Sequence, residues 1–278
     1  MPRENCINVV FGKRGNLSGH LKGSLNNVTL VSSGSIVTNL DRINWEKYKK
    51  INFILNQFQP SAMLNDISSP NNYIDSSLKS TSIILDYIKQ KKINVNKIIY
   101  TSSSSVYGNN ELCSEDDVPS VVNLHASLKV ANEQLIKSVC NDIGIDYTIA
   151  RIFNMYGGDD NFSIISKIIS SYWGVGILHL INDGESIRDF IHIDDVVSIY
   201  REILEVRGFP IINVSTGIGQ SVSSLLLFLM KNDININYKN VDMNEIRISI
   251  SDNNMLLEIM KGYDFIKVDE YLLSKLKM

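Results

Sequence analysis

This chain of 278 residues is poor in cysteine, proline and tryptophan, with 3, 5 and 2 residues of these kinds. The cysteines Cys6, Cys113 and Cys140 are odd in number and far apart, so they predict neither a disulfide framework nor a cysteine-based metal site. No grouping of His, Cys and Asp suggests a metal centre. Unpaired thiols fit a reducing compartment, so we expect a cytoplasmic protein.

The chain also lacks an excess of charge and long apolar runs. Its 27 Lys and Arg residues nearly balance 30 Asp and Glu, which excludes a nucleic-acid binder recognisable by basic charge. The same balance excludes an acidic disordered chain. The run 225–230 is too short to span a bilayer, and the first residues do not resemble a signal peptide. We expect neither nucleic acid nor a membrane as a partner.

Short apolar runs alternate with amphipathic ones, without internal repeats. Apolar residues at steps of three and four predict helices at 73–91 and 124–140. The runs that predict buried strands are 7–11, 28–32, 51–56, 97–101 and 147–151. This alternation indicates an α/β fold, a doubly wound parallel sheet of the Rossmann type.

Beyond the fifth strand the pattern loosens, although it still predicts a helix at 164–172 and a strand at 210–214. We therefore expect a cofactor-binding Rossmann domain at 1–157, to which 188–216 returns. The remainder, 158–278, is expected to form a smaller C-terminal α/β lobe that binds substrate.

A glycine-rich loop follows the first predicted strand. Gly12 permits a tight turn and Gly15 permits close approach of a pyrophosphate at a helix N-terminus, which is typical of dinucleotide binding. The usual third glycine is replaced by Ser18, a residue small enough to keep the helix packed on the strand. An ordinary strand-to-helix turn remains the alternative.

The second predicted strand ends at Ser32 without the acidic residue that binds the adenosine ribose of NAD. Arg14, in the glycine loop, suits a phosphate on that ribose. Together these features favour NADP(H) over NAD(H). Simple solvation of Lys13 and Arg14 is the competing interpretation.

Three further motifs carry a family resemblance. They are SSSSVYG at 102–108, RIFNMYG at 151–157 and GESIRDFIHIDDV at 184–196. With the glycine loop, they make the chain similar to the extended short-chain dehydrogenase/reductase family, specifically its nucleotide-sugar epimerases, dehydratases and 4-ketoreductases. The segment NVSTG at 213–217, followed by Ser221 and Val222, fits the same family.

The resemblance implies a catalytic set with one departure. Ser103 would hydrogen-bond the reacting oxygen of the substrate, and Lys129 would bind the nicotinamide ribose. The family places a Tyr four residues before this Lys, on the same helix face. Here that position is His125.

Three interpretations of His125 stay open. The imidazole carries the proton in an altered mechanism, Ser103 or water supplies the proton, or the site has lost its redox chemistry. The cation of Lys129 disfavours protonated His125, and neutral imidazole is a poor acid.

The resemblance also implies binding residues. Those expected at the cofactor are Gly12, Arg14, Gly15, Asn16, Leu17, Ser32, Asn39, Leu55, Asn56 and Lys129. Those expected at the substrate are Ser103, Ser104, Asn154 and Arg188, the last two near the diphosphate. His192, Asp194 and Asp195 are expected to orient their loop, with an Asp capping a helix at 194–206. The Asp-Glu pair of the dehydratases is replaced by Ser104 and Ser105, which argues against a 4,6-dehydratase.

The resulting expectation is NADP(H)-dependent reduction of a nucleotide-linked 4-keto(-6-deoxy) sugar, in the synthesis of bacterial-type surface polysaccharide. One alternative is a nucleotide-sugar epimerase of the same family. Another is a catalytically impaired protein that binds cofactor and nucleotide sugar. The resemblance also implies a homodimer that pairs through the helices at 73–91 and 124–140.

Overall fold

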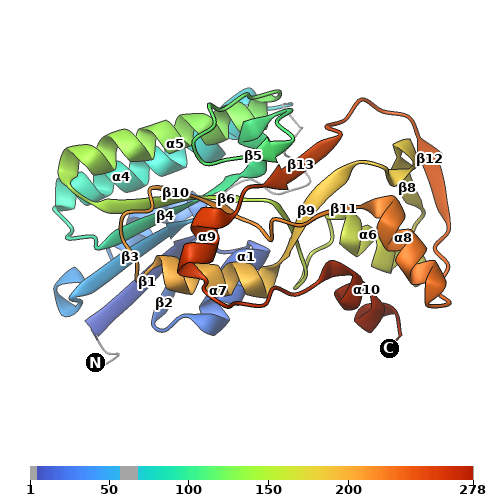
Figure 1. Ribbon diagram of the computed structural model, residues 1–278. Coiled ribbons are helices and arrows are strands. Elements are labelled where there is room, and N and C mark those ends of the chain that lie inside the picture. Colours follow the sequence, from blue (N-terminus) through green and yellow to red (C-terminus); the bar gives the residue numbers. More distant parts are fainter. Residues whose placement is uncertain (1–4, 57–67, 278) are drawn as a thin grey trace. The chain divides into compact units, whose positions relative to one another are not determined.

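The computed structural model describes residues 5–56 and 68–277, which form two compact units (Figure 1). Unit 1 comprises Met1–Val106, Val121–Arg151 and Val197–Ile212, and unit 2 comprises Tyr107–Ser120, Ile152–Val196 and Asn213–Met278. The contacts thus group 107–120 and 152–157 with the second unit, whereas the sequence pattern suggested a first domain running to 157. The segment that returns to unit 1 is 197–212.

Unit 1 is built on a six-stranded sheet. Its strands are β1 (Cys6–Phe11), β2 (Val28–Val31), β3 (Lys50–Leu55), β4 (Lys97–Ser103), β6 (Asp146–Ile152) and β10 (Ile211–Val214). They lie in the order β10-β6-β4-β3-β1-β2, and the pairs β1–β2, β1–β3 and β3–β4 are parallel. The predicted doubly wound sheet is confirmed. Because the chain moves outward in opposite directions from β1 and β3, their carboxyl ends form the switch point where such sheets bind ligands.

Helices cover this sheet because its strands are apolar along their whole length. They are α1 (Asn16–Ser24), α2 (Ile36–Leu40), α4 (Ser80–Lys91), α5 (Leu124–Ile143) and α7 (Ile193–Ile203). Side chains of β1, β3, β4 and β6 form one core with α2, α4 and α5. The side chain of Asn123 caps α5 by accepting from the backbone of Ala126, and Gly144, at φ 70°, ends it.

Two predicted helices differ in detail. The helix expected at 73–91 begins earlier, as α3 (Pro70–Ile74), and passes through a π-helical turn (Asp75–Lys79) before α4. Proline suits a helix start, because the first turn needs no N–H from it. Helix α7 begins at Ile193, so Asp194 lies inside its first turn instead of capping it.

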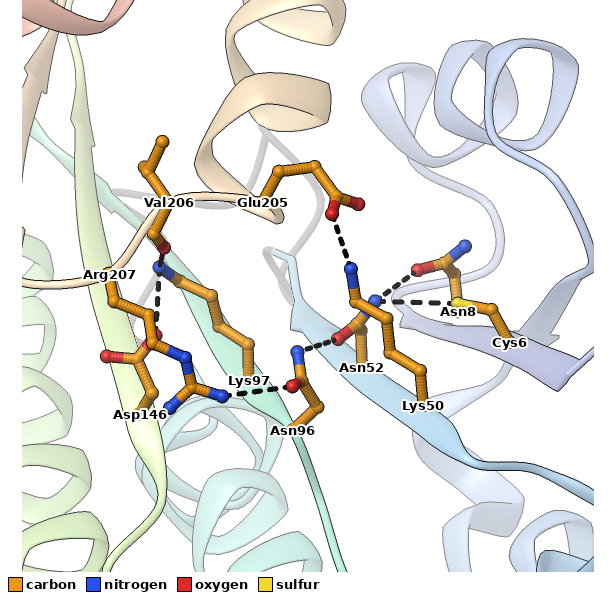
Figure 2. A network of polar contacts seen from close by, with 10 residues as sticks. All are labelled: Cys6, Asn8, Lys50, Asn52, Asn96, Lys97, Asp146, Glu205, Val206 and Arg207. Atoms are coloured by element: carbon orange, nitrogen blue, oxygen red, sulfur yellow. Dashed lines mark hydrogen bonds and ion pairs between the residues drawn. The ribbon is translucent and has the colours of Figure 1, made fainter. Parts of the chain in front are cut away.

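A polar network closes the amino end of the sheet (Figure 2). Asn52 on β3 donates to Asn8 on β1 at 2.9 Å and accepts from Asn96 at 3.0 Å. Lys97, only 1% exposed, donates to the Val206 carbonyl at 2.6 Å. These hydrogen bonds satisfy the buried amide groups at the amino ends of the strands, which is the end opposite to the switch point.

Unit 2 contains two smaller sheets and their helices. The larger has the order β11-β9-β13-β5, with β7 also pairing with β9, and β8 pairs with β12. Their bounds are β5 (Leu112–Cys113), β7 (Asn154–Tyr156), β8 (Leu178–Ile181), β9 (Ile187–His192), β11 (Gly219–Ser221), β12 (Tyr238–Val241) and β13 (Ile248–Ser251). The helices are α6 (Ile164–Tyr172), α8 (Val222–Lys231), α9 (Asn254–Ile259) and α10 (Val268–Leu276). A single apolar cluster joins α6, α8 and α10 to β8 and β9.

Candidate functional site

The glycine loop turns directly from β1 into α1. Gly12 has φ 83°, a conformation that favours glycine, and its N–H donates to the Val31 carbonyl of β2. A Cβ on Gly15 would lie 3.3 Å from the Gly12 carbonyl oxygen, which is a tight contact. Helix α1 follows without any side chain capping its N-terminus. A backbone cradle that ends in an uncapped helix N-terminus fits the pyrophosphate of a dinucleotide.

Ser18 takes the place of the third glycine without a packing defect. It is fully buried in α1, and its hydroxyl accepts from Asn56 at 2.8 Å. Asn56 in turn accepts from Thr101 at 2.6 Å, so the carboxyl ends of β3 and β4 are tied to α1. The Thr101 hydroxyl also lies 2.7 Å from that of Tyr200 on α7. The serine therefore adds an acceptor for the Asn56 amide nitrogen that glycine would not provide.

The residues expected near the adenosine lie at the end of β2. Ser32 follows the strand and precedes a short 3-10 turn, where its side chain makes no capping bond. Asn39 on α2 donates both to the Ser35 carbonyl and to the Ser35 hydroxyl, each at 2.7 Å. Arg14 is exposed in the glycine loop. No acid stands at the strand end, so the only formal charges offered there by the loop are positive.

Lys129 is held at the carboxyl end of β4. Its ammonium donates to the Thr101 carbonyl at 2.7 Å and lies 5.1 Å from the centre of the Tyr100 ring. The residue is only 7% exposed. Burial lowers the pKa of Lys129 to about 8, and the carboxylate of Glu133 opposes part of this shift. At pH 7 most of the Lys129 side chain is still protonated, and a buried ammonium at this place is suited to binding a polar ligand group.

His125 lies one helical turn before Lys129 on α5. Burial and the charge of Lys129 lower its pKa to about 4, as the sequence predicted in direction. The imidazole is therefore neutral at pH 7. Within the described residues it makes no side-chain hydrogen bond, which leaves its ring nitrogens available to a ligand.

Ser103 is the last residue of β4, and Ser104 begins the 3-10 turn that follows. The Ser103 hydroxyl is partly exposed and accepts from the Ser105 backbone at 3.2 Å. Its own proton remains available to donate. Thr101 on the same strand accepts a hydrogen bond from Lys129, so β4 and α5 lie against each other at this point. The three predicted catalytic residues therefore lie on two neighbouring elements.

A buried charge network beside these residues was not found by motif reading. Glu133 accepts from the Ser102 hydroxyl and from two nitrogens of Arg151, at 3.2 and 2.8 Å. The side chains of Glu133 and Arg151 are each 3% exposed. Spacing offered a signal, because Glu133 stands four residues after Lys129 and eight after His125, on one helix face.

In unit 2, the residues expected near a diphosphate are both engaged. Asn154 on β7 donates to the Asp189 carbonyl at 3.0 Å. The guanidinium of Arg188 pairs with Glu245 at 3.1 Å and donates to the Ile246 and Ile187 carbonyls. Burial lowers the pKa of Arg188 while Glu245 raises it. The carboxylate of Glu245 therefore occupies a place beside the Arg188 guanidinium that an anionic ligand of Arg188 would need.

The acidic residues of the same motif hold loops together. Asp189, fully buried, accepts from the backbone of Thr216 and Gly217, at 2.9 and 2.8 Å. Asp195 accepts from the Tyr263 hydroxyl and the Ile266 backbone, at 2.9 and 3.0 Å. These bonds anchor the C-terminal segment to α7, which agrees with the orienting role expected of Asp195.

In the part of the chain that the structure describes, no three His, Cys, Asp or Glu residues gather as metal ligands. None of the helices described there is long and apolar enough to cross a membrane.

Comparison with known proteins decides the family. The description "NAD dependent epimerase/dehydratase family" matches residues 24–215, which is more than half of the chain. This chain belongs to that family. The resemblance to the extended short-chain dehydrogenase/reductases is thereby confirmed, and the description of the family names NAD, a nicotinamide cofactor.

Individual members of the family differ in reaction. The chain is 26% identical over 208 residues to the UDP-glucose 4-epimerase of Pasteurella multocida, covering 65% of this chain and 61% of that protein. It is 28% identical over 179 residues to the GDP-6-deoxy-D-talose 4-dehydrogenase of Aggregatibacter actinomycetemcomitans, covering 60% and 59%. The chain thus spans about three-fifths of the length of these relatives.

Solved structures share the fold along nearly the whole chain. RMD from Pseudomonas aeruginosa, complexed with NADPH, has a TM-score of 0.78 and 22% identity, and the match covers 98% of this chain and 97% of RMD. Such a likeness supports the architecture of this family member without deciding its substrate.

Proposed function

We propose that this family member catalyses NADP(H)-dependent reduction of a nucleotide-linked 4-keto sugar, of the 4-keto-6-deoxy type, in the cytoplasm. The product would serve the synthesis of bacterial-type surface polysaccharide. The observation that carries the proposal is the buried Lys129 of α5, whose ammonium binds the Thr101 carbonyl of β4. Ser103 is the last residue of β4, and His125 lies one helical turn before Lys129 on α5. This arrangement offers one cation and two proton-handling groups.

Preference for a 2′-phosphate is supported by charge. The end of β2 carries Ser32 and no acid, so nothing there repels a phosphate. Arg14 is exposed beside the uncapped end of α1 and can reach into solvent for an anion. One neighbouring structure contains NADPH, which agrees with this assignment, whereas the description of the family names NAD.

Each residue of the proposed site would have a separate task. The loop at Gly12 and Gly15, with Asn16 and Leu17 at the helix start, would hold the pyrophosphate. Asn39, Leu55 and Asn56 would line the cofactor, and Lys129 would bind its ribose. The nicotinamide supplies a hydride when bound. Ser103 and Ser104 would bind the sugar, with Ser103 donating to the reacting oxygen, while His125 delivers the proton that the product alcohol needs.

Two alternatives are supported by particular observations. A 4-epimerase is supported by the family description and by the UDP-glucose 4-epimerase relative. A protein that binds but does not turn over is supported by the low pKa of His125, since a neutral imidazole is a weak acid.

One assay separates these functions. Purified protein is mixed with NADPH and nucleotide-linked 4-keto-6-deoxy sugars, and absorbance at 340 nm reports oxidation. Parallel incubation with NAD and UDP-glucose, followed by sugar analysis, reports epimerisation. Stoichiometric NADPH loss supports reduction, whereas interconversion without net NADPH loss contradicts it. Tight binding of both ligands without either reaction would show a binding protein.

Replacing Glu245 with glutamine is expected to tighten binding of a nucleoside diphosphate about tenfold. The carboxylate competes with the ligand for Arg188, and removing one charge at a partly buried site is worth about 1 kcal/mol or more. Calorimetric titration with UDP, GDP and dTDP measures the effect. Arg188→Gln should weaken the same binding, and equal affinities in all three proteins would remove the diphosphate role from Arg188.

The homodimer is proposed to form through α3, α4 and α5. A groove on their outward faces is lined by Ile74, Leu78, Lys79, Ser82, Ala131 and Leu135. A second copy would cover it by packing the same helices. Ala131→Arg is expected to convert a dimer into a monomer in sedimentation velocity, because a buried unpaired charge is costly. A dimer retained by the variant would locate the interface elsewhere.

A further inference from the structure

The catalytic face of α5 continues past Lys129 to a buried carboxylate. His125, Lys129 and Glu133 follow at intervals of four residues, so they lie in one row along the helix. The last two each contact β4: Lys129 donates to the Thr101 carbonyl, and Glu133 accepts from the Ser102 hydroxyl. The two contacts join the helix to the strand immediately before Ser103.

Glu133 is itself fixed from a third element. Arg151 on β6 binds it through two nitrogens, and both side chains are 3% exposed. A bidentate pair of this kind sets the carboxylate's position closely. Such a pair is costly to bury and contributes little net stability compared with apolar residues of the same size. Its presence directly under a functional lysine therefore calls for an explanation other than stability.

The charge of Glu133 supplies that explanation. Lys129 is buried, and no carboxylate is paired with its ammonium among the described residues; its one hydrogen-bond acceptor there is a neutral carbonyl. Glu133 is the charged group that favours its protonated form, whereas burial acts against it. Without Glu133, the ammonium would lose its proton at a lower pH.

We infer that Glu133 is a positioning residue of the site, which holds the end of β4 on α5 and balances the positive charge of Lys129. This inference rests on the proposed function, in which Lys129 binds the cofactor. It adds a residue that touches neither cofactor nor substrate but extends to higher pH the range in which Lys129 keeps its proton.

The test measures where Lys129 titrates. NADPH affinity is determined by fluorescence from pH 6 to 10, and the free energy of unfolding of the ligand-free protein is determined in urea over the same range. The wild type should lose affinity with a midpoint near pH 8. Glu133→Gln keeps the shape but removes the charge, and should move both midpoints down by about one unit or more, which is about fivefold in affinity at pH 8.

Three further variants make the result decisive. Glu133→Met combined with Arg151→Met removes the pair without leaving an unpaired charge, so it should fold and show a smaller downward shift, because loss of the Arg151 cation offsets part of the loss of the carboxylate. Ser102→Ala removes one hydrogen bond to Glu133 without removing a charge, and should keep a midpoint close to that of the wild type. Lys129→Met should abolish the midpoint in both measurements.

The outcomes separate the inference from the function on which it rests. Wild-type midpoints in both Glu133 variants, with a lost midpoint in Lys129→Met, would overturn the role of Glu133 alone. An equal shift in Ser102→Ala would assign the effect to packing and would also overturn it. A wild-type affinity profile in Lys129→Met would overturn the cofactor role of Lys129 and this inference with it.

Discussion

Lys129→Met should lower kcat/KM for NADPH-dependent reduction by about 10²–10³, the usual effect of removing one preorganised donor from an active site. The Thr101 carbonyl already aligns the ammonium of Lys129. Methionine offers neither the charge nor the hydrogen-bond donors, so the variant loses both. Initial rates at 340 nm measure the effect. Lys89→Met, which removes an exposed lysine paired with Asp142, is the matched control and should retain the wild-type rate.

The same substitution has a signature in stability. The pKa of Lys129 is about 8 in the folded chain and 10.5 as a free side chain. Between these values the unfolded chain binds more protons, so the free energy of unfolding rises with pH across this window. Lys129→Met should remove this rise. A rate and a pH slope both equal to those of the wild type would contradict the position assigned to Lys129.

His125→Ala should lower the rate of reduction by about 10²–10⁴, the range of general acid catalysis. Because the pKa of His125 is about 4, only a small fraction is protonated near neutrality. The wild-type rate should therefore rise about tenfold for each unit that the pH falls from 8 toward 5. Initial rates across this range, normalised for folded protein, measure the slope.

His125→Tyr provides the contrasting variant. A phenol next to the cation of Lys129 donates its proton readily at neutral pH, so the rate at pH 8 should exceed that of the wild type and depend less on pH. An unchanged rate in His125→Ala would transfer the proton to Ser103 or water. Turnover only in the Tyr variant would identify the natural chain as a binding protein.

The pH dependence of stability distinguishes His125 from Lys129. The pKa of His125 is depressed from 6.5 to about 4, so its contribution is present above pH 6.5 and is lost as the pH falls toward 4. The contribution of Lys129 changes only above pH 8. A single pH series of unfolding experiments therefore resolves both groups.

Most of the fold of unit 1 could be predicted from the sequence, because its strands are continuous apolar runs. The strand predicted at 51–56 is observed as Lys50–Leu55, and the helix predicted at 124–140 as Leu124–Ile143. The boundaries between the units could not be predicted. They depend on segments such as 107–120, whose contacts join residues far apart in the sequence.

The same division applies to the site. Sequence spacing alone predicts four of the proposed site residues, because each stands at a fixed sequence distance from another of them within one turn or one helix. They are Gly12, Gly15, His125 and Lys129. Sequence alone therefore determined which residue departs from the family's motif, and it predicted which chemical groups the site offers. It also predicted that the pKa of His125 is lowered, because Lys129 lies one helical turn away.

Only the tertiary structure decided what these groups touch. Ser18 meets Asn56 across 38 residues, Glu133 meets Ser102 across 31, and Arg188 meets Glu245 across 57. No periodicity encodes such pairs, because the order of strands in a sheet and the course of loops bring them together. The physical reason is that spacing specifies one face of one element, whereas the pKa and the free donors of a buried group depend on every element packed against it.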